Sequence, residues 1–103
     1  MSYAELEMKV IQWGEARGIV KNSTPSAQAL KTQEELDELI DALRNNDRAA
    51  IADAYGDILV TLIMGCAITD LDLVSCLDGA YQEIKNRKGY LNSDGIFVKE
   101  NQI

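Results

Sequence analysis

The sequence predicts an all-α, single-domain protein with a four-helix bundle-like fold and a short extended C-terminal tail. The chain has 103 residues, 47% of them apolar, so residues 1–103 suit one compact domain. One proline and seven glycines leave room for long helices. Apolar residues recur at helical spacing in four segments, with no repeat or low-complexity tract between them. A chain this short buries a modest core alone, so we also expect it to oligomerise.

The first predicted helix covers about residues 2–17. Ser2 and Glu5 match a capping box, in which the serine accepts a backbone N–H and the glutamate reaches back. Gly18 and the polar stretch "KNSTPS" break the pattern. One face of this predicted helix carries a stripe at helical spacing that consists of Leu6, Val10, Trp13 and Arg17.

The second predicted helix begins at Thr24 and Pro25, a capping hydroxyl followed by proline at the first helical position, and ends near Asn45. Its apolar side holds Leu36, Leu39, Ile40 and Leu43. Its other side holds Glu34, Glu35, Glu38 and Asp41. A solvated acidic face is the ordinary interpretation of such a pattern, and it stays open here.

The third predicted helix covers about residues 48–68 and has apolar residues around nearly its whole circumference. This pattern is typical of a helix with protein on all sides. Asp53 and Asp57 stand just before its uncharged run, on the side that Val60 and Met64 continue. Ionised carboxylates in such surroundings are costly unless cations lie close to them.

The fourth predicted helix is capped by Thr69 or Asp70 and ends near Arg87. The turn-rich tail that follows contains "IFV", which suits a short strand or an extended arm. The residues expected to point inward from the helix are Leu73, Leu77, Ala80, Tyr81 and Ile84.

Composition excludes several classes of function. The net charge of −7 argues against nucleic-acid polymers and anionic membranes as partners. The uncharged run is too short for a membrane span, and no secretory leader is expected. Cys66 and Cys76 suggest buried thiols in a reducing cytoplasm. Without histidine, and without a glycine-rich phosphate loop, catalysis must use carboxylates, hydroxyls, lysine, arginine and metals.

Four carboxylates form the main candidate site. Glu35 and Glu38 lie on adjacent turns of the second helix, and antiparallel packing would bring them to Asp53 and Asp57 on the third. Hard oxygen ligands of this kind suit Mg²⁺. The sequence therefore predicts a magnesium cluster between these two helices.

The segments "KTQEELDEL" and "DAYGDILVTL" resemble the signature of the MazG-like all-α nucleoside triphosphate pyrophosphohydrolases, particularly single-domain members of phage and integron type. "IQW", "STPSAQALK", "AYQEIKNRKGY" and "DGIFVKE" extend the resemblance over almost the whole chain, in order. The family pattern has ExxE on one helix and ExxD on the next. This chain departs from it at Ala54, where Asp53 is the nearest carboxylate.

The resemblance implies hydrolysis of a nucleoside triphosphate to the monophosphate and diphosphate, with Mg²⁺ or, as a substitute, Mn²⁺. It implies a cytoplasmic, house-cleaning enzyme of the nucleotide pool that assembles as a homotetramer, a dimer of dimers. Glu35, Glu38 and Asp57 would be metal ligands, with Asp53 in the fourth place. Glu34 is a further catalytic candidate, as a ligand or to orient the attacking water.

Candidate substrate-binding residues lie on three segments. Trp13 and Gln28 suit a nucleobase or sugar, although Trp13 equally suits core packing. Lys31 lies one turn before Glu35. The basic stretch with Lys85, Asn86, Arg87 and Lys88 suits phosphates, with Arg87 as the strongest candidate, or simply a helix end.

Two alternatives to this function stay open. One is a phosphoribosyl-ATP pyrophosphohydrolase, which shares the fold and the chemistry. The other is a non-catalytic helical module that uses the acidic helix as a docking surface.

Overall fold

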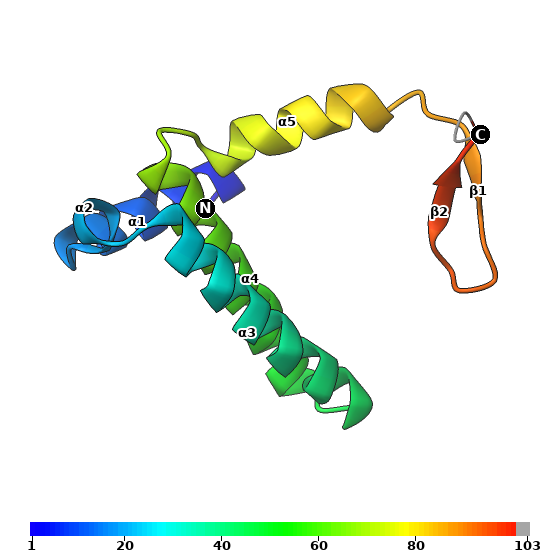
Figure 1. The fold of residues 1–103 in the computed structure, drawn as a ribbon, viewed down its shortest axis with the longest axis horizontal. Coiled ribbons are helices and arrows are strands. Elements are labelled where there is room, and N and C mark those ends of the chain that lie inside the picture. The colour runs from blue at the N-terminus through cyan, green and yellow to red at the C-terminus, as the bar shows by residue number, and fades with distance from the viewer. Residues whose placement is uncertain (101–103) are drawn as a thin grey trace.

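The computed structural model describes residues 1–100, and these form five helices followed by a β-hairpin (Figure 1). The helices are α1 (Tyr3–Ala16), α2 (Ile19–Asn22), α3 (Pro25–Arg44), α4 (Arg48–Ile68) and α5 (Leu73–Ile84). The strands β1 (Gly89–Leu91) and β2 (Phe97–Lys99) pair antiparallel, with Tyr90 opposite Val98. The predicted mainly helical fold is confirmed. The short helix α2 was not predicted, because only five residues separate Gly18 from the Thr24 cap.

Side-chain caps fix where the long helices begin. The Ser2–Glu5 capping box is present, and the Thr24 hydroxyl accepts the N–H of Ala27 at 3.0 Å. The predicted cap of α5 was wrong: Asp72 caps this helix by accepting the N–H of Ser75 at 2.7 Å. Thr69 instead donates its hydroxyl to carbonyls of the last turn of α4, so it ends α4 and does not start α5.

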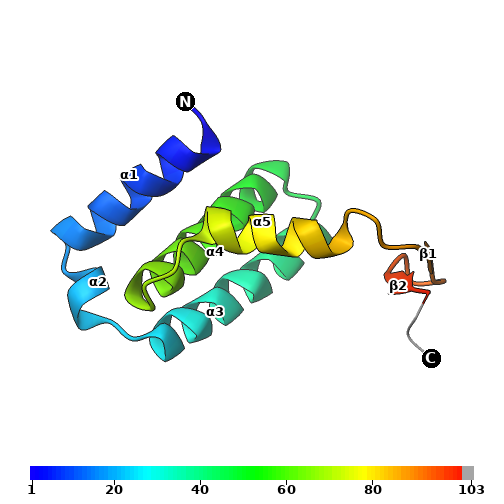
Figure 2. The same cartoon turned by 90° about the horizontal axis from the view of Figure 1, so that it is seen from above.

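Helices α3 and α4 form an antiparallel hairpin that is the centre of the molecule (Figures 1 and 2). The turn between them passes through Asn46, whose φ of 51° lies in the left-handed region that asparagine tolerates. The buried apolar residues of the hairpin are Leu39, Ala42, Ala54, Ile63 and Met64. This core is small, and Leu36, Ile40 and Leu43 of the predicted apolar stripe remain exposed in the single chain.

Helix α1 packs against α4 on the side away from α3, as Figure 2 shows. The two helices meet closely at Gly14, where a Cβ would overlap the sulfur of Met64. Helix α2 also contacts α4 and closes the space between α1 and the start of α3. One end of the α3–α4 hairpin is therefore covered by α1 and α2.

Helix α5 and the β-hairpin project from this body (Figure 1). Helix α5 contacts only α1 and α4, and within residues 1–100 the β-hairpin contacts no helix. No residue of α5 is buried, so the prediction that Leu77, Tyr81 and Ile84 point into a core is wrong for the single chain. Cys76, predicted to be a buried thiol, is likewise exposed. The radius of gyration is 16.1 Å, whereas a compact chain of this length has about 13 Å.

Helix α4 is long and apolar enough, by length and composition alone, to cross a membrane. The sequence-based estimate used only the uncharged run, which is shorter than the helix that forms. One such helix is weak evidence, because the core helix of a soluble protein has the same properties.

Candidate active site

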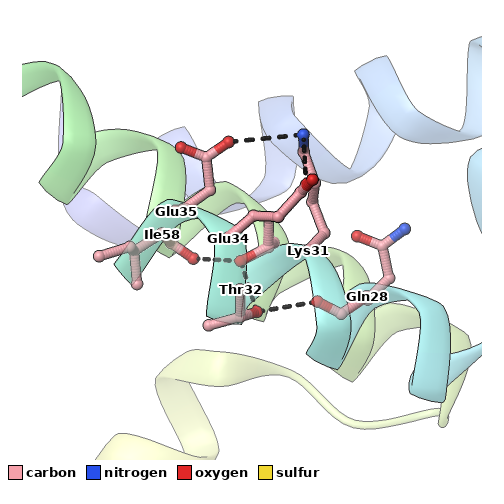
Figure 3. A network of polar contacts seen from close by, with 7 residues as sticks. Gln28, Lys31, Thr32, Glu34, Glu35 and Ile58 are labelled. Atoms are coloured by element: carbon pink, nitrogen blue, oxygen red, sulfur yellow. Dashed lines mark hydrogen bonds and ion pairs between the residues drawn. The ribbon is translucent and has the colours of Figure 1, made fainter. Parts of the chain in front are cut away.

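Glu35 is the most deeply placed carboxylate between α3 and α4. The residue is 8% exposed, although it carries a charge. Its Oε1 lies 3.7 Å from Nζ of Lys31, one turn earlier on α3, and Lys31 also pairs with Glu34 at 3.0 Å (Figure 3). Its Oε2 is buried and has no hydrogen-bond partner within the described residues. A buried, unpartnered carboxylate oxygen is costly, so this atom marks a place where a cation is favoured.

The surroundings of Glu35 raise its pKa. Burial contributes most, and the neighbouring Glu38 and the charge of Asp57 add to it, while Lys31 acts in the opposite direction. The pKa of Asp57, on α4, is also raised, first by burial and then by the charges of Asp53 and Glu38. Each of the four predicted carboxylates therefore acts on at least one of the others, and Glu35 and Glu38 act on or respond to Asp57 across the α3–α4 interface, although Glu38 and Asp53 are exposed.

The departure at Ala54 has a structural consequence. Ala54 is 3% exposed and forms part of the core of the hairpin. Asp53, one residue earlier, lies at the surface and still acts on Asp57. Asp53 therefore places its carboxylate one residue before position 54, where the family pattern has a glutamate and this chain has a core alanine.

A pair of threonines holds α3 and α4 together next to these carboxylates. The hydroxyl oxygens of Thr32 and Thr61 are 2.7 Å apart. Thr32 can also donate to the carbonyl of Gln28 at 2.9 Å, and Thr61 to that of Ile58 at 2.7 Å (Figure 3). Two protons thus serve three short contacts. Sequence analysis missed both threonines, because their pairing depends on which turns of the two helices face each other.

The four carboxylates are the type of ligand that a hard dication prefers, but their side chains are not arranged around a common point. No group of three or more His, Cys, Asp or Glu side chains among residues 1–100 is arranged so that it could hold a metal as it stands. The raised pKa values and the unpartnered oxygen of Glu35 nevertheless show a shortage of positive charge there. Exposed side chains such as Glu38 and Asp53 can rotate toward a bound ion. Glu35, Glu38, Asp53 and Asp57 could therefore hold a divalent metal.

An apolar cavity of about 530 Å³ adjoins the carboxylates. Glu35, Asp57 and Lys31 line its polar end, and the helices α1 to α4 supply the rest. Its other lining residues are Trp13, Ile19, Ala27, Gln28, Val60, Thr61 and Met64. Trp13 and Gln28, predicted to contact substrate, are thus placed here together with Lys31. An aromatic ring and an amide suit a flat ligand group at one end, and the two carboxylates at the other end would suit an anionic group once a dication is bound.

Trp13 carries a second feature at the edge of this cavity. The guanidinium of Arg17 lies 4.7 Å from the centre of the indole and donates to the carbonyl of Trp13. Trp13 itself is half-exposed. It is therefore not a core residue, and one of its two predicted alternatives is removed.

The structure does not bring the predicted phosphate-binding stretch to this site. Lys85, Asn86, Arg87 and Lys88 follow α5, which points away from the α3–α4 hairpin (Figure 1). Asn86, Arg87 and Lys88 line a separate cavity of about 490 Å³ together with Glu83, Lys99 and Glu100. Within one chain these residues stay apart from the carboxylates, because α5 does not fold back onto α3, and their role in substrate binding stays a prediction.

Comparison with known proteins shows what the chain is similar to. The family model of the MazG nucleotide pyrophosphohydrolase domain matches residues 23–91, more than half of the chain. An uncharacterised 18.2 kDa protein from the rep-hol intergenic region of Haemophilus phage HP1 is 33% identical over 70 residues. The matched part is 68% of this chain and 43% of the phage protein, so the similarity spans less than half of that relative. No solved structure matched.

Proposed function

The chain belongs to the MazG nucleotide pyrophosphohydrolase family, and from this premise we propose that it hydrolyses a nucleoside triphosphate to a monophosphate and diphosphate. The observation that carries the proposal is the buried, unpartnered oxygen of Glu35 opposite Asp57. Helices α3 and α4 both place carboxylates there, and the positive charge nearby is too small to balance them. Such a site favours a dication and, through it, a polyphosphate.

Glu35, Glu38, Asp57 and Asp53 are the proposed metal ligands, and Mg²⁺ is the proposed ion, with Mn²⁺ as a substitute. When bound, such an ion neutralises charge on phosphate oxygens and lowers the pKa of a coordinated water. A bound ion would also lower the mutual repulsion of these carboxylates. Glu34 is exposed and pairs with Lys31, which lines the adjoining cavity, and it is the proposed group that orients the attacking water.

The adjoining cavity indicates how the nucleotide would be oriented when bound. We place the nucleobase at the apolar end, against the indole of Trp13, where the Gln28 amide can hydrogen-bond with its edge. The triphosphate then points toward Glu35 and Asp57, with Lys31 as the cation supplied by the same chain. This orientation places the phosphates, and not the base, next to the carboxylates.

The biological setting follows the family. Proteins of this family are typically soluble, and we propose a cytoplasmic, house-cleaning role in the nucleotide pool. The strongly acidic composition disfavours nucleic-acid polymers and membranes as partners. We also propose a homo-oligomer, a dimer of dimers, because the single chain leaves α5 without any buried residue.

The test is a panel of canonical and modified nucleoside triphosphates, with phosphoribosyl-ATP included, assayed for diphosphate and orthophosphate release. We expect diphosphate release that requires Mg²⁺ or Mn²⁺. Glu38→Gln should lower turnover by at least about 100-fold, because losing a metal ligand costs more than losing a residue that only orients one. Its circular dichroism spectrum should stay unchanged, since Glu38 is exposed.

The matched control is Asp41→Asn, which removes an exposed carboxylate from the same helix, beyond the cluster. This variant should keep wild-type turnover. Orthophosphate as the only product, or equal turnover in Glu38→Gln and wild type, contradicts the proposed site. A protein that binds neither Mg²⁺ nor a non-hydrolysable nucleotide in calorimetry is instead a helical interaction module.

A further inference from the structure

Met64 lies at the apolar end of the cavity, away from the carboxylates. It follows Asp57 by seven residues on α4, and Gln28 precedes Glu35 by seven residues on α3. Because the two helices run antiparallel, Met64 and Gln28 both lie about 10 Å along the hairpin from the carboxylates. A Cβ at Gly65 would stand 3.7 Å from Cβ of Gln28, so the two helices meet at this level. Met64 therefore lies where the nucleobase is proposed to bind.

Met64 is the most deeply buried of the residues that line this cavity. It is 2% exposed, and its unbranched thioether turns about three rotatable bonds. Methionine sulfur also makes favourable contacts with aromatic rings, so it suits a surface that a flat base touches. Because such a side chain adapts its shape, its position depends on the groups that confine it.

Gly14 on α1 confines the end of the Met64 side chain, at the contact between α1 and α4 (Figure 2). A Cβ at residue 14 would stand 2.8 Å from Cε of Met64 and closer still to its sulfur, inside van der Waals contact. The same Cβ would lie 3.6 Å from Cγ2 of Val20, which is an ordinary contact, so Met64 would have to move. Since Met64 is buried, the open space next to its thioether is the cavity that it lines.

Packing, and not backbone conformation, accounts for glycine at residue 14. Gly14 does not have a positive φ, whereas Gly18 and Gly95 do. Glycine is less favourable than alanine within a helix, so the backbone alone would favour alanine at this position. The missing side chain therefore keeps the Met64 thioether out of the cavity.

We propose that Met64 sets the depth of the apolar end, and that Gly14 positions Met64, so that together they decide how well a purine or a pyrimidine base fits; this rests on the proposed function. The proposed metal ligands hold the phosphate end of the nucleotide. A purine has a second ring and reaches deeper than a pyrimidine from the same sugar. A change of depth at Met64 therefore acts more strongly on the purine.

Two substitutions change this depth in opposite directions. Gly14→Ala should push the Met64 thioether into the cavity, and Met64→Ala should remove it. The measurement is kcat/KM for dATP and dCTP, which share a sugar and differ in the size of the base. The ratio of the dATP value to the dCTP value should fall about tenfold in Gly14→Ala and rise about tenfold in Met64→Ala. Tenfold is about the lower end of what one methylene in an apolar pocket is worth.

The split between kcat and KM separates this role from a merely structural one. The change should lie in KM, and kcat for dCTP should stay near the wild-type value, because the carboxylates lie two helical turns away. The double variant Gly14→Ala/Met64→Ala should show the ratio of Met64→Ala, since no thioether is left for residue 14 to move. Where one nucleotide is not turned over, calorimetry with non-hydrolysable analogues of dATP and dCTP gives the same comparison.

Gly79→Ala is the matched control, because a Cβ at this position of α5 stands in open space. It should keep the wild-type ratio. Folded Gly14→Ala and Met64→Ala proteins with the wild-type ratio overturn the proposal, and so does an equal loss for both nucleotides.

A double variant whose ratio differs from that of Met64→Ala overturns the positioning role of Gly14. Circular dichroism checks the fold of each variant, and if one single variant does not fold, the other decides, because they predict opposite changes. A wild type that neither hydrolyses nor binds any nucleotide refutes the proposed function instead, so the two failures are distinguishable.

Discussion

Glu35 is where the requirements of folding and of the proposed chemistry oppose each other. Its carboxylate is buried, one oxygen faces Lys31 at 3.7 Å, and the other has no partner among the described residues. The pKa of Glu35 is raised, chiefly by this burial, so its ionised form is disfavoured in the folded state. A protein that only needed stability would place a neutral side chain there.

The residue scale also shows what a single sequence can predict. The spacing of Glu35, Glu38 and Asp57 was enough to predict that they act together, because helix geometry fixes which turns share a face. It was not enough to predict that Glu35 is more deeply buried than Asp53 or Asp57. The sequence pattern predicted instead that Asp53 and Asp57 on α4, next to the apolar run, are the carboxylates in buried surroundings. Burial depends on how two helices rotate against each other, and no local pattern contains that information.

We predict that Glu35→Gln makes the fold more stable and the site inactive. A carboxyl group with a raised folded-state pKa contributes stability below its ordinary value of 4.5 and loses that contribution as pH rises through the folded-state value. At pH 7 the ionised carboxylate therefore destabilises the fold, and glutamine removes that cost. The measurement is the midpoint of thermal unfolding across pH 3 to 8 in a chelator. Glu35→Gln should exceed wild type at neutral pH, and the difference should shrink in acid.

Magnesium provides the control for this prediction. A ligand that binds only the folded state raises the unfolding midpoint in proportion to its occupancy. Wild type should gain stability as Mg²⁺ is added, and Glu35→Gln should gain much less. Equal gains for both proteins would show that the ion binds elsewhere.

At the scale of elements, the contact between Thr32 and Thr61 sets how α3 lies against α4. Thr61 is buried and Thr32 is partly buried, and the pair is next to Glu35, one turn further along α3. Helix boundaries could be predicted from caps and turn residues, since these act within a few positions. The partner of a threonine in the middle of a helix could not, because a mid-helix hydroxyl ordinarily bonds to its own backbone.

We predict that the two threonines are energetically coupled. Thr32→Val and Thr61→Val should each lower the free energy of unfolding, by about 1 kcal/mol, the usual net value of a hydrogen bond. The double variant should lose less than the sum, because the second substitution has no remaining bond to break. Urea unfolding of the four proteins measures the cycle. Strict additivity would mean that the 2.7 Å contact contributes nothing to stability.

We predict that the start of α5 is sensitive to acid. The backbone N–H and the hydroxyl of Ser75 both donate to Asp72 and lower its pKa. A group with a depressed folded-state pKa contributes stability above its ordinary value of 3.8 and loses it as pH falls through the folded-state value. Asp72→Asn keeps a cap but does not titrate, so its unfolding midpoint should fall less than that of wild type below pH 4. Parallel pH profiles of the two proteins would contradict this.

At the scale of the whole molecule, the single chain lacks the compactness its composition predicted. The all-round apolar character of α4 predicted burial on every side, yet Leu59 and Leu62 remain exposed in the single chain. The position of α5 was the largest error. Its apolar stripe, with Leu77 and Ile84, predicts a buried face but cannot say whether the covering surface belongs to the same chain or to another. That ambiguity is inherent in the hydrophobic pattern, since it records burial and not the identity of the partner.

The last prediction tests whether α5 is an assembly element. Leu77→Glu places a charge on the exposed apolar face of α5, at a residue that is 62% exposed in the single chain. If this face is buried between copies, the charge must be desolvated there, and the assembly should dissociate toward monomers in light scattering coupled to size exclusion. The monomer should keep its helical circular dichroism, because Leu77 packs into no core of its own chain. Gln82→Glu adds the same charge to the polar side of the same helix and should leave the assembly intact. A Leu77→Glu protein that elutes with the wild-type mass would mean that this face of α5 is not buried between copies.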